Sequence, residues 1–415
     1  MTRSLAVACA VLLLAAPTAG QTVAITGGTV YTAAGEPIRN GTVLIRDGRI
    51  VAVGADVDVP ADARRVDARG KWVTPGLIVL GTQLGLVEIG AVAETREANF
   101  NSSDVSAGFN PLEGVNPASQ LIPVARTNGV TTSLLTPGGG LIAGQAVVID
   151  LLGERIEDLV VRSPAGIVIR LGEASKGAGG DTRAGVMARL RRLFRDAREY
   201  DRRRQDYRRD EMQSLAASPE DLDALLPVLR GEQPAWIMAS RRSDIENALR
   251  LAAEFQLSMV LVGGEEAWQV ADRIAAASVP VVLDAMIDIP VYNAPSPRLD
   301  NAALLHRAGV SIIISNFDTH NARNIRQSVG HAIAYGLPWA AGLEAATINA
   351  ARAAGIADQY GSLEAGRVAN VVIWSADPFD FEAAAETVFI RGREVPPSSR
   401  QRDLLDRYRT LPPRY

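Results

Sequence analysis

Few side chains in this sequence offer an imidazole or a thiol group. The 415 residues include three histidines, at 306, 320 and 331, and one cysteine, Cys9. Imidazole and thiolate are the donors that an ion such as Zn²⁺ prefers. This scarcity limits the metal chemistry open to the chain, and a lone cysteine excludes an internal disulfide.

His320 is the histidine best placed for catalysis. It lies six residues after the apolar run 312–314, in the segment that also holds Asn316 and Asp318. Such a position suits a general base or a ligand-binding donor. The alternative is a loop histidine that caps the following helix. His306 falls on a predicted helix surface and His331 inside a predicted helix, so both are interpreted as structural or solvated.

A barrel must position these groups. Between residues 76 and 361, apolar runs alternate with amphipathic helices, as in repeated βα units. Near-continuous apolar strands indicate a parallel sheet buried on both faces, and the length suits a (β/α)₈ TIM-like barrel with its active site at the carboxyl ends of the strands. The predicted strands lie at 78–80, 131–135, 167–169, 235–238, 259–262, 279–283 and 312–314. The predicted helices lie at 243–255, 266–277, 300–308, 323–335 and 339–354.

Both ends of the chain show hairpin patterns instead. Residues 21–75 and 362–395 predict one small composite β-sandwich domain with the barrel, 76–361, inserted between them. The charged tail 396–415 is expected to be partly helical. Residues 189–212 carry ten arginines and six acids on a helical pattern. This insertion predicts a solvated helix leaning on the barrel, or alternatively a docking or oligomer surface.

The first 20 residues have the pattern of a secretory signal peptide. Arg3 precedes an apolar run at 5–16, which is too short to span a bilayer, and small residues follow at 17–20. We expect export to the periplasm or the medium, with no transmembrane segment in the mature chain. The alternative is a buried helix of the mature fold. A net charge of −4 favours no nucleic-acid partner.

Four segments resemble the amidohydrolase superfamily, in its imidazolonepropionase-like branch. They occur in the family's order and at its separations, and together they cover the chain up to about residue 395. The segments are 48–54 (GRIVAVG), 73–78 (VTPGLI), 128–132 (NGVTT) and the pair 345–351 and 361–370. The resemblance implies hydrolysis of amide-like C–N bonds by a metal-activated water, with zinc in intact members.

The resemblance also shows what has been lost. After strand 1 the family has Asp-x-His-x-His, where this sequence has Val79, Gly81 and Gln83. Glycine offers no ligand atom, and glutamine is a poor substitute for imidazole. We therefore expect no metal cofactor, and Gln83 is interpreted only as a pocket residue.

The later ligand positions are replaced as well. Ser240 stands at the strand 5 end, and the His-Gly-x-Glu motif of strand 6 is matched by Gly263 through Glu266. The strand 8 aspartate corresponds either to Asn316 or to Asp318. Ser240, Glu266 and Asn316 are thus predicted to line the old pocket.

One family acid remains in place. Glu173 matches a Gly-Glu segment after strand 4 and is predicted, with Asp318 and His320, to be a catalytic acid or base. Lys176 is the one candidate for a metal-bridging carbamate, and the missing histidines argue against that role.

Several functions fit this sequence. The favoured hypothesis is an exported, metal-free binding protein or pseudoenzyme with a small-molecule ligand. A hydrolase with altered acid/base chemistry at Glu173, Asp318 and His320 is the runner-up. A metalloenzyme with replaced ligands is a third. An interaction subunit is the fourth, forming a homo-oligomer or pairing with an active amidohydrolase paralogue.

Overall fold

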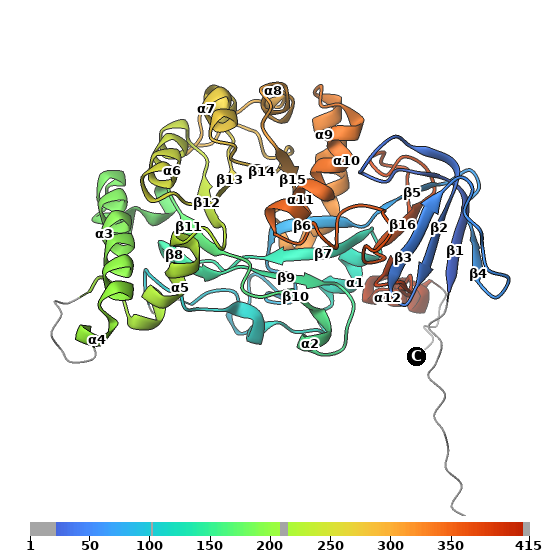
Figure 1. Ribbon diagram of the computed structural model, residues 1–415, viewed down its shortest axis with the longest axis horizontal. Coiled ribbons are helices and arrows are strands. Elements are labelled where there is room, and N and C mark those ends of the chain that lie inside the picture. The colour runs from blue at the N-terminus through green and yellow to red at the C-terminus, as the bar shows by residue number, and fades with distance from the viewer. Residues whose placement is uncertain (1–21, 101–102, 208–214, 410–415) are drawn as a thin grey trace, which may run out of the picture.

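The computed structural model describes residues 22–100, 103–207 and 215–409. A sheet built largely from the amino-terminal strands stands at one end, beside a larger α/β body flanked by helices (Figure 1). The predicted signal segment 1–20, with Cys9, lies outside the described residues. Within the described ranges, no helix has the length and apolar character needed to cross a membrane.

Both ends of the chain build the small domain. Its eight strands run in the order β18-β17-β16-β5-β1-β2-β3, with β4 paired to β1. The strand pairing describes one continuous sheet, where a two-layer sandwich was predicted. Its apolar side chains form one main cluster and a smaller one around Ala24 and Leu44, and some strands of it also pack on the barrel. The strands are β1 (Val23–Val30), β2 (Ile38–Arg46), β3 (Arg49–Gly54), β4 (Arg64–Asp67), β5 (Trp72–Pro75), β16 (Val371–Trp374), β17 (Ala385–Ile390) and β18 (Arg393–Glu394).

The α/β body contains a strand at each of the seven predicted apolar runs. They form two sheets, one of order β10-β9-β7-β6 and one of order β15-β14-β13-β12-β11-β8. The strands are β6 (Leu77–Thr82), β7 (Val130–Leu135), β8 (Ile142–Gln145), β9 (Val147–Asp150), β10 (Val160–Arg162), β11 (Ile167–Arg170), β12 (Ala235–Ala239), β13 (Met259–Gly263), β14 (Val281–Leu283) and β15 (Ile312–Ile314).

The third barrel position differs from a regular (β/α)₈ pattern. It is filled by β8 and β9, which follow each other with Ala146 between them and run antiparallel to β11 and β7 respectively. The backbone of Ala146 exchanges hydrogen bonds with the 165–166 segment across this break. The prediction of parallel strands throughout was therefore wrong at this position, because a hairpin-like return replaces a βα crossover.

Strand β15 meets β6 through a side chain. The hydroxyl of Ser315 donates to the carbonyl of Leu80 at 2.6 Å and accepts from its amide at 2.8 Å. These two bonds link the outer strands of the two sheets where a backbone ladder would close a regular barrel. The strand order is that of a TIM-like barrel, and Ser315 bridges its seam.

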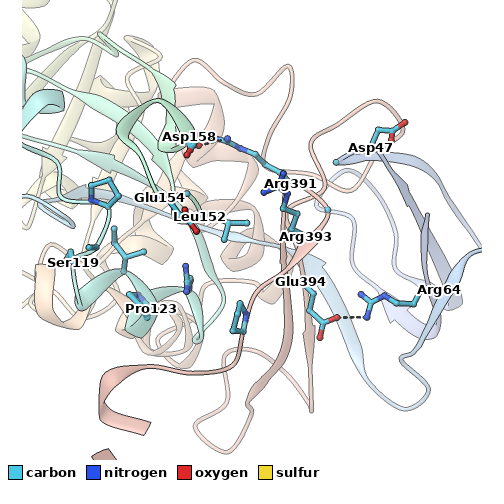
Figure 2. A pocket seen from close by; sticks show the side chains of 18 residues that line it. Asp47, Arg64, Ser119, Pro123, Leu152, Glu154, Asp158, Arg391, Arg393 and Glu394 are labelled. Carbon is cyan, nitrogen blue, oxygen red and sulfur yellow. Dashed lines mark hydrogen bonds and ion pairs between the residues drawn. The ribbon is translucent and has the colours of Figure 1, made fainter. Parts of the chain in front are cut away.

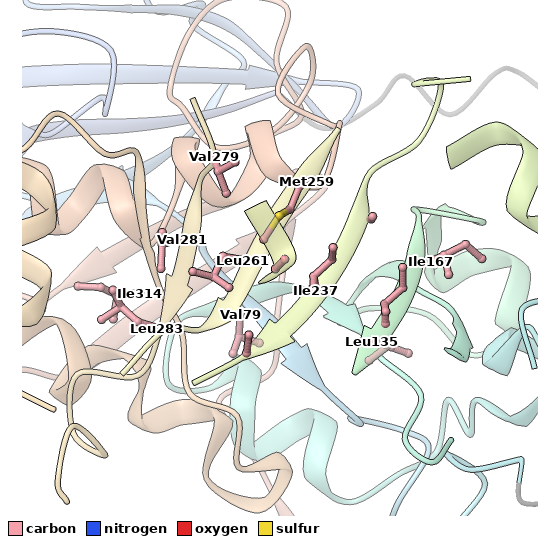
Figure 3. Packing of buried hydrophobic residues seen from close by; sticks show 14 of the residues in the cluster. Val79, Leu135, Ile167, Ile237, Met259, Leu261, Val279, Val281, Leu283 and Ile314 are labelled. Carbon is pink, nitrogen blue, oxygen red and sulfur yellow. The ribbon is translucent and has the colours of Figure 1, made fainter. Parts of the chain in front are cut away.

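Alternate residues of each strand pack into two clusters. Leu261 of β13 belongs to the cluster that faces the outer helices, part of which is shown in Figure 3. Its neighbours Val260 and Val262 belong to the second cluster, which fills the barrel interior together with Trp236. Two buried faces per strand explain the near-continuous apolar runs of the sequence.

Helices follow most strands near the predicted positions. The predicted helix 339–354 is broken at Thr347, where φ is −134° and ψ is −92°. The α-helices are α1 (Leu121–Arg126), α2 (Ile156–Leu159), α3 (Arg183–Arg202), α4 (Arg204–Tyr207), α5 (Pro219–Leu229), α6 (Arg242–Phe255), α7 (Ala271–Ala276), α8 (Asn301–Arg307), α9 (Ile325–Ala334), α10 (Trp339–Ala345), α11 (Ile348–Ala353) and α12 (Arg400–Tyr408). The short 3-10 helices are η1 (Ala93–Thr95), η2 (Pro111–Gly114), η3 (Glu173–Gly179), η4 (Ala267–Val270) and η5 (Thr319–Asn324).

The arginine-rich insertion is helical where it is described. Leu190, Leu193, Phe194 and Ala197 of α3 are fully buried against the body, as the helical pattern predicts. Its arginines form surface ion pairs, for example Arg191 with Glu254 at 2.6 Å. The insertion is therefore a helix leaning on the barrel, and residues 208–214 of it lie outside the described residues.

A buried carboxylate joins the barrel to the small domain. Asp150, at the end of β9, is fully buried and accepts four side-chain hydrogen bonds. One oxygen binds the hydroxyl of Thr132 at 2.8 Å and the amide of Asn370 at 3.1 Å. The other binds Arg391 at 2.7 Å and the Tyr360 hydroxyl at 3.0 Å. A single acid thus ties residues far apart in the chain.

We expect Asp150→Asn to lower the free energy of unfolding by about 2–4 kcal/mol, since it removes the partner charge of Arg391 and turns an acceptor into a donor. Urea unfolding followed by far-UV circular dichroism measures this change. The matched control is Asp67→Asn, which breaks the exposed ion pair with Arg69 and should leave the unfolding midpoint unchanged. Equal midpoints for the two variants would contradict a joining role for Asp150.

Candidate functional site

The candidate site lies where the barrel strands end. Loops after β6, β12, β13 and β15 carry the predicted pocket residues, and parallel strands bring these loops, with the loop after β14, to one face. The side chains there come from distant parts of the sequence, so their contacts decide what this barrel mouth can bind.

Phe317 fills the place next to Gly81. A side chain built at Gly81 would begin 2.9 Å from the Phe317 ring, which is closer than real contacts allow. Gly81 also has a φ of +79°, a conformation that glycine adopts easily and other residues adopt at a cost. Phe317 packs against the interior cluster of the barrel, so its ring extends the apolar core into the mouth.

Gln83 is held at the rim by weak contacts. Its backbone amide donates to the Thr319 hydroxyl at 3.1 Å, and its side-chain amide lies 3.5 Å from the carbonyl of Thr136. It is partly buried and free of strong side-chain bonds within the described chain. This position agrees with a pocket residue.

A carboxyl group faces the glycine that ends β13. A side chain at Gly263 would lie 3.2 Å from a carboxyl oxygen of Glu265 and 3.4 Å from the hydroxyl of Ser240. Burial raises the pKa of Glu265, and a hydrogen bond from Ser240 opposes part of that rise. Ser240 and Glu265 therefore occupy the space in which the strand 5 and strand 6 histidines would meet.

Glu266 has a structural role in its loop. Its side chain is 4% exposed and accepts from the backbone amides of Arg242 at 2.8 Å and Ser296 at 2.9 Å. Both carboxyl oxygens are therefore occupied by the loops that they hold. Glu266 lies beside the mouth but has no free acceptor directed into it.

Asn316 and Asp284 form a buried polar pair. The Asn316 amide donates to Asp284 at 3.2 Å, and Asp284 also accepts from the Ser328 hydroxyl at 2.7 Å and the Met286 amide at 3.1 Å. Burial raises the pKa of Asp284, while these hydrogen bonds oppose the rise. Of the two residues that could match the strand 8 aspartate, Asn316 is the one that points inward.

Asp318 and His320 lie at the exposed rim. Asp318 caps η5 by accepting the His320 backbone amide at 2.9 Å, and the two side chains are 4.0 Å apart. Burial raises the pKa of Asp318, but hydrogen bonds from Asn321 and from the backbone outweigh it and hold the pKa below its usual value. The His320 ring contacts the carbonyl of Glu88 at 3.1 Å.

Glu173 is ion-paired with two cations, at a strand end away from Asp318 and His320. It lies on η3 after β11, with Lys176 at 2.8 Å and Arg183 at 3.4 Å. The hydrogen bond from Lys176 lowers the pKa of Glu173 and favours the carboxylate. No hydrogen bond or ion pair in the described ranges joins Glu173 to Asp318 or His320. The structure therefore does not assemble these three residues into one acid/base set.

Sequence reasoning missed the most unusual acid of the mouth. Asp288, four residues after Asp284, is 3% exposed, and neither of its carboxyl oxygens has a hydrogen-bond partner. Burial and the nearby Glu265 raise its pKa to about 8. The sequence could have indicated Asp288 only by its place in the loop after the predicted strand 279–283. It matches no motif of the resemblance.

The donor set at the mouth does not fit the divalent metal that the resemblance implies. Glycines stand at two ligand positions, where an added Cβ would come within 2.9 Å of Phe317 or 3.2 Å of Glu265. Among the described residues, no three histidine, cysteine, aspartate or glutamate side chains converge as a metal site requires. Zinc prefers nitrogen and sulfur ligands at about 2.0–2.3 Å, and Gly81, Gln83, Ser240 and Gly263 supply neither.

A large cleft lies elsewhere. It has a volume of about 1300 Å³ and runs between the small domain and the barrel (Figure 2). Four arginines and four acids line it, and its opposite charges balance. None of the seven predicted site residues is among its lining residues. The charged lining side chains are Arg64, Arg126, Arg391, Arg393, Asp47, Glu154, Asp158 and Glu394.

Several known proteins are similar to this chain in sequence and in fold. A model of the amidohydrolase family matches residues 245–395. The amidohydrolase tasK of Hapsidospora irregularis is 26% identical over 85% of the chain, which spans only 39% of that relative. The imidazolonepropionase of Aromatoleum aromaticum is 26% identical over 82% of the chain and 86% of its own length.

The structural comparison agrees. A solved amidohydrolase from Thermotoga maritima MSB8 superposes with a TM-score of 0.82 at 28% identity, covering 90% of this chain and 99% of that one. Matching motifs, matching order and matching architecture all lead to the same family. The chain is a member of the amidohydrolase superfamily, in its imidazolonepropionase-like branch.

Proposed function

We propose that this protein binds a small molecule at the barrel mouth without a divalent metal. Membership of the family supports hydrolysis of C–N bonds as the ancestral activity. The observation that carries the metal-free proposal is the Phe317 ring over Gly81, because it fills the space that an imidazole ligand needs. Replacement of the other ligands by Ser240, Gly263 and Asn316 supports the same conclusion.

Hydrolysis with altered acid/base chemistry is the second candidate. Family membership favours it, and Glu265, Asp284 and Asp288 are acids whose pKa values are raised by burial, as suits a proton donor. The predicted set of Glu173, Asp318 and His320 gives it less support, because Asp318 and His320 are exposed at the rim and Glu173 is ion-paired with Lys176 and Arg183.

An interaction subunit is a further possibility within the same fold. Exposed apolar side chains of the β14–α8 loop, with Tyr292 92% exposed, would suit a partner surface. This role is compatible with ligand binding at the mouth. We also propose export, on the basis of residues 1–20.

We expect the protein purified from the exported fraction to contain far less than one zinc, iron or manganese ion per chain. Elemental analysis by mass spectrometry measures the metal content, and intact-mass analysis of the same sample reads the amino terminus, expected near residue 21. One tightly held ion per chain would overturn the metal-free proposal. An uncleaved amino terminus would argue against export and leave the metal question separate.

We expect Gly81→Ala to destabilise the protein more than Gly70→Ala. Both glycines have a similar positive φ, +79° and +75°, but only Gly81 has a neighbour, Phe317, within 4 Å of an added Cβ. The shared backbone cost is about 1–2 kcal/mol, and the steric contact should add roughly 1–3 kcal/mol at Gly81. Denaturant unfolding of the two variants gives the difference. Equal losses would show that the ring does not fill this space.

We expect no turnover of cyclic amides or acyl-dipeptides above the uncatalysed rate. The assay compares the native protein with His320→Ala, a rim variant that should leave the fold intact because the ring is exposed. Turnover that His320→Ala abolishes would establish the acid/base hydrolase instead.

A further inference from the structure

The loop after β14 has its polarity inverted. Asp288 is 3% exposed, whereas its apolar neighbours Ile287 and Ile289 are 44% and 55% exposed. A loop normally turns its carboxylates to water and its apolar groups inward, because burying a charge without a partner is costly. Burial of this carboxyl group without a partner costs free energy, so the inversion indicates a functional role for the Asp288 side chain.

Asp288 differs from the nearby Asp284 in having no hydrogen-bond donor for its carboxyl oxygens. Asp284 accepts three hydrogen bonds, from Ser328, Met286 and Asn316, and is fully explained by the fold. Asp288 has two buried oxygens without a partner, and Glu265 has one. Buried polar groups in native proteins are nearly always satisfied, so three such acceptors in adjacent loops point to a missing donor.

The groups that face Asp288 are acidic or neutral. Glu265 and Asp284 act on it through their charges, and the amide of Asn301 is the neighbouring neutral donor. The Asn301 side chain donates one N–H to the carbonyl of Gly264 and accepts from the amide of Trp268, so one N–H remains to face Asp288. No lysine or arginine is among the groups that shift the pKa of Asp288 or Glu265. A positive charge brought to this place would be stabilised by both carboxyl groups.

We propose that Asp288 and Glu265 together bind the ammonium or guanidinium group of a cationic small molecule in the barrel mouth. An alkylammonium group has three N–H donors, matching the three orphaned oxygens. A divalent metal fits less well, because no three ligating side chains in the described ranges converge on one point. The inference rests on the proposed ligand-binding function and names its ligand class.

Proton release accompanies this binding. The pKa of Asp288 is about 8, so the carboxyl group is mostly protonated at pH 7 and must lose its proton to pair with the cation. At pH 7 the release should be about 0.9 proton per ligand, and the affinity should rise roughly ninefold from pH 6 to 7 and about fivefold from pH 7 to 8. Above the pKa the affinity should level off.

The test is isothermal titration of the full-length mature protein with methylammonium, guanidinium and benzylamine, in two buffers of different ionisation enthalpy. Benzyl alcohol is the neutral counterpart of benzylamine. We expect binding of at least one cation, none of the alcohol, and the stated proton release. Asp288→Asn and Glu265→Gln should each weaken binding at least tenfold, while Asp300→Asn, at the ion pair with Arg298 outside the site, should not.

The folding of Asp288→Asn is checked by its stability. Because the folded pKa of about 8 exceeds the ordinary 3.8, the native state holds a proton that the unfolded chain has lost, and wild-type stability falls as pH rises through that window. The asparagine variant lacks this loss, so its melting temperature relative to wild type should increase from pH 4 to pH 8.

Two failures are distinguishable. Cation binding that is unchanged in Asp288→Asn and Glu265→Gln, or no binding of any of the three cations to metal-free protein, overturns this inference and leaves the metal-free function standing. A stoichiometric metal ion in the exported protein overturns the proposed function itself.

Discussion

The contact between the Phe317 ring and the backbone of Gly81 determines what the barrel mouth can hold. It places an aromatic ring at the end of the interior cluster, where an open polar cavity would otherwise begin. Gly81 has no Cβ, so the ring can come this close without a collision. Its positive φ is also a conformation that glycine adopts easily. The ring and the glycine come from opposite ends of the barrel sequence. The ring fits only because Gly81 has no Cβ, and it occupies the space that an imidazole side chain at this position would take.

Three carboxyl groups of the loops after β13 and β14, those of Glu265, Asp284 and Asp288, act on one another through their charges. In a metal centre the ion supplies the positive charge that keeps neighbouring acids ionised. Here the fold uses two other means. Asp284 is satisfied by three donors, whereas Asp288 is buried with its pKa raised to about 8. The second arrangement carries an energetic cost, which is the physical reason to regard Asp288 as functional rather than structural.

Three buried polar contacts link the two barrel sheets and join the barrel to the small domain. The barrel seam is bridged by Ser315, and the small domain is tied to the barrel by Asp150 and by Arg326, whose buried guanidinium donates to the carbonyls of Pro378, Asp380 and Ala383. None of these contacts uses the carboxyl groups of Glu265, Asp284 or Asp288. The mouth can therefore change its chemistry while the fold persists, and for this reason the family alone does not determine the function.

The sequence by itself determined the strands, the helices and the family, because periodic burial and short local motifs are written in consecutive residues. All seven predicted barrel strands are present, and the buried face of α3 was identified from its spacing. It also showed that the chain has only three histidines, all after residue 305. Only the tertiary structure decided the antiparallel strand at the third position, the separation of Glu173 from His320, and the burial of Asp288. These features depend on contacts between residues far apart in the chain, and a side chain's partners and exposure follow from packing rather than from its neighbours in sequence.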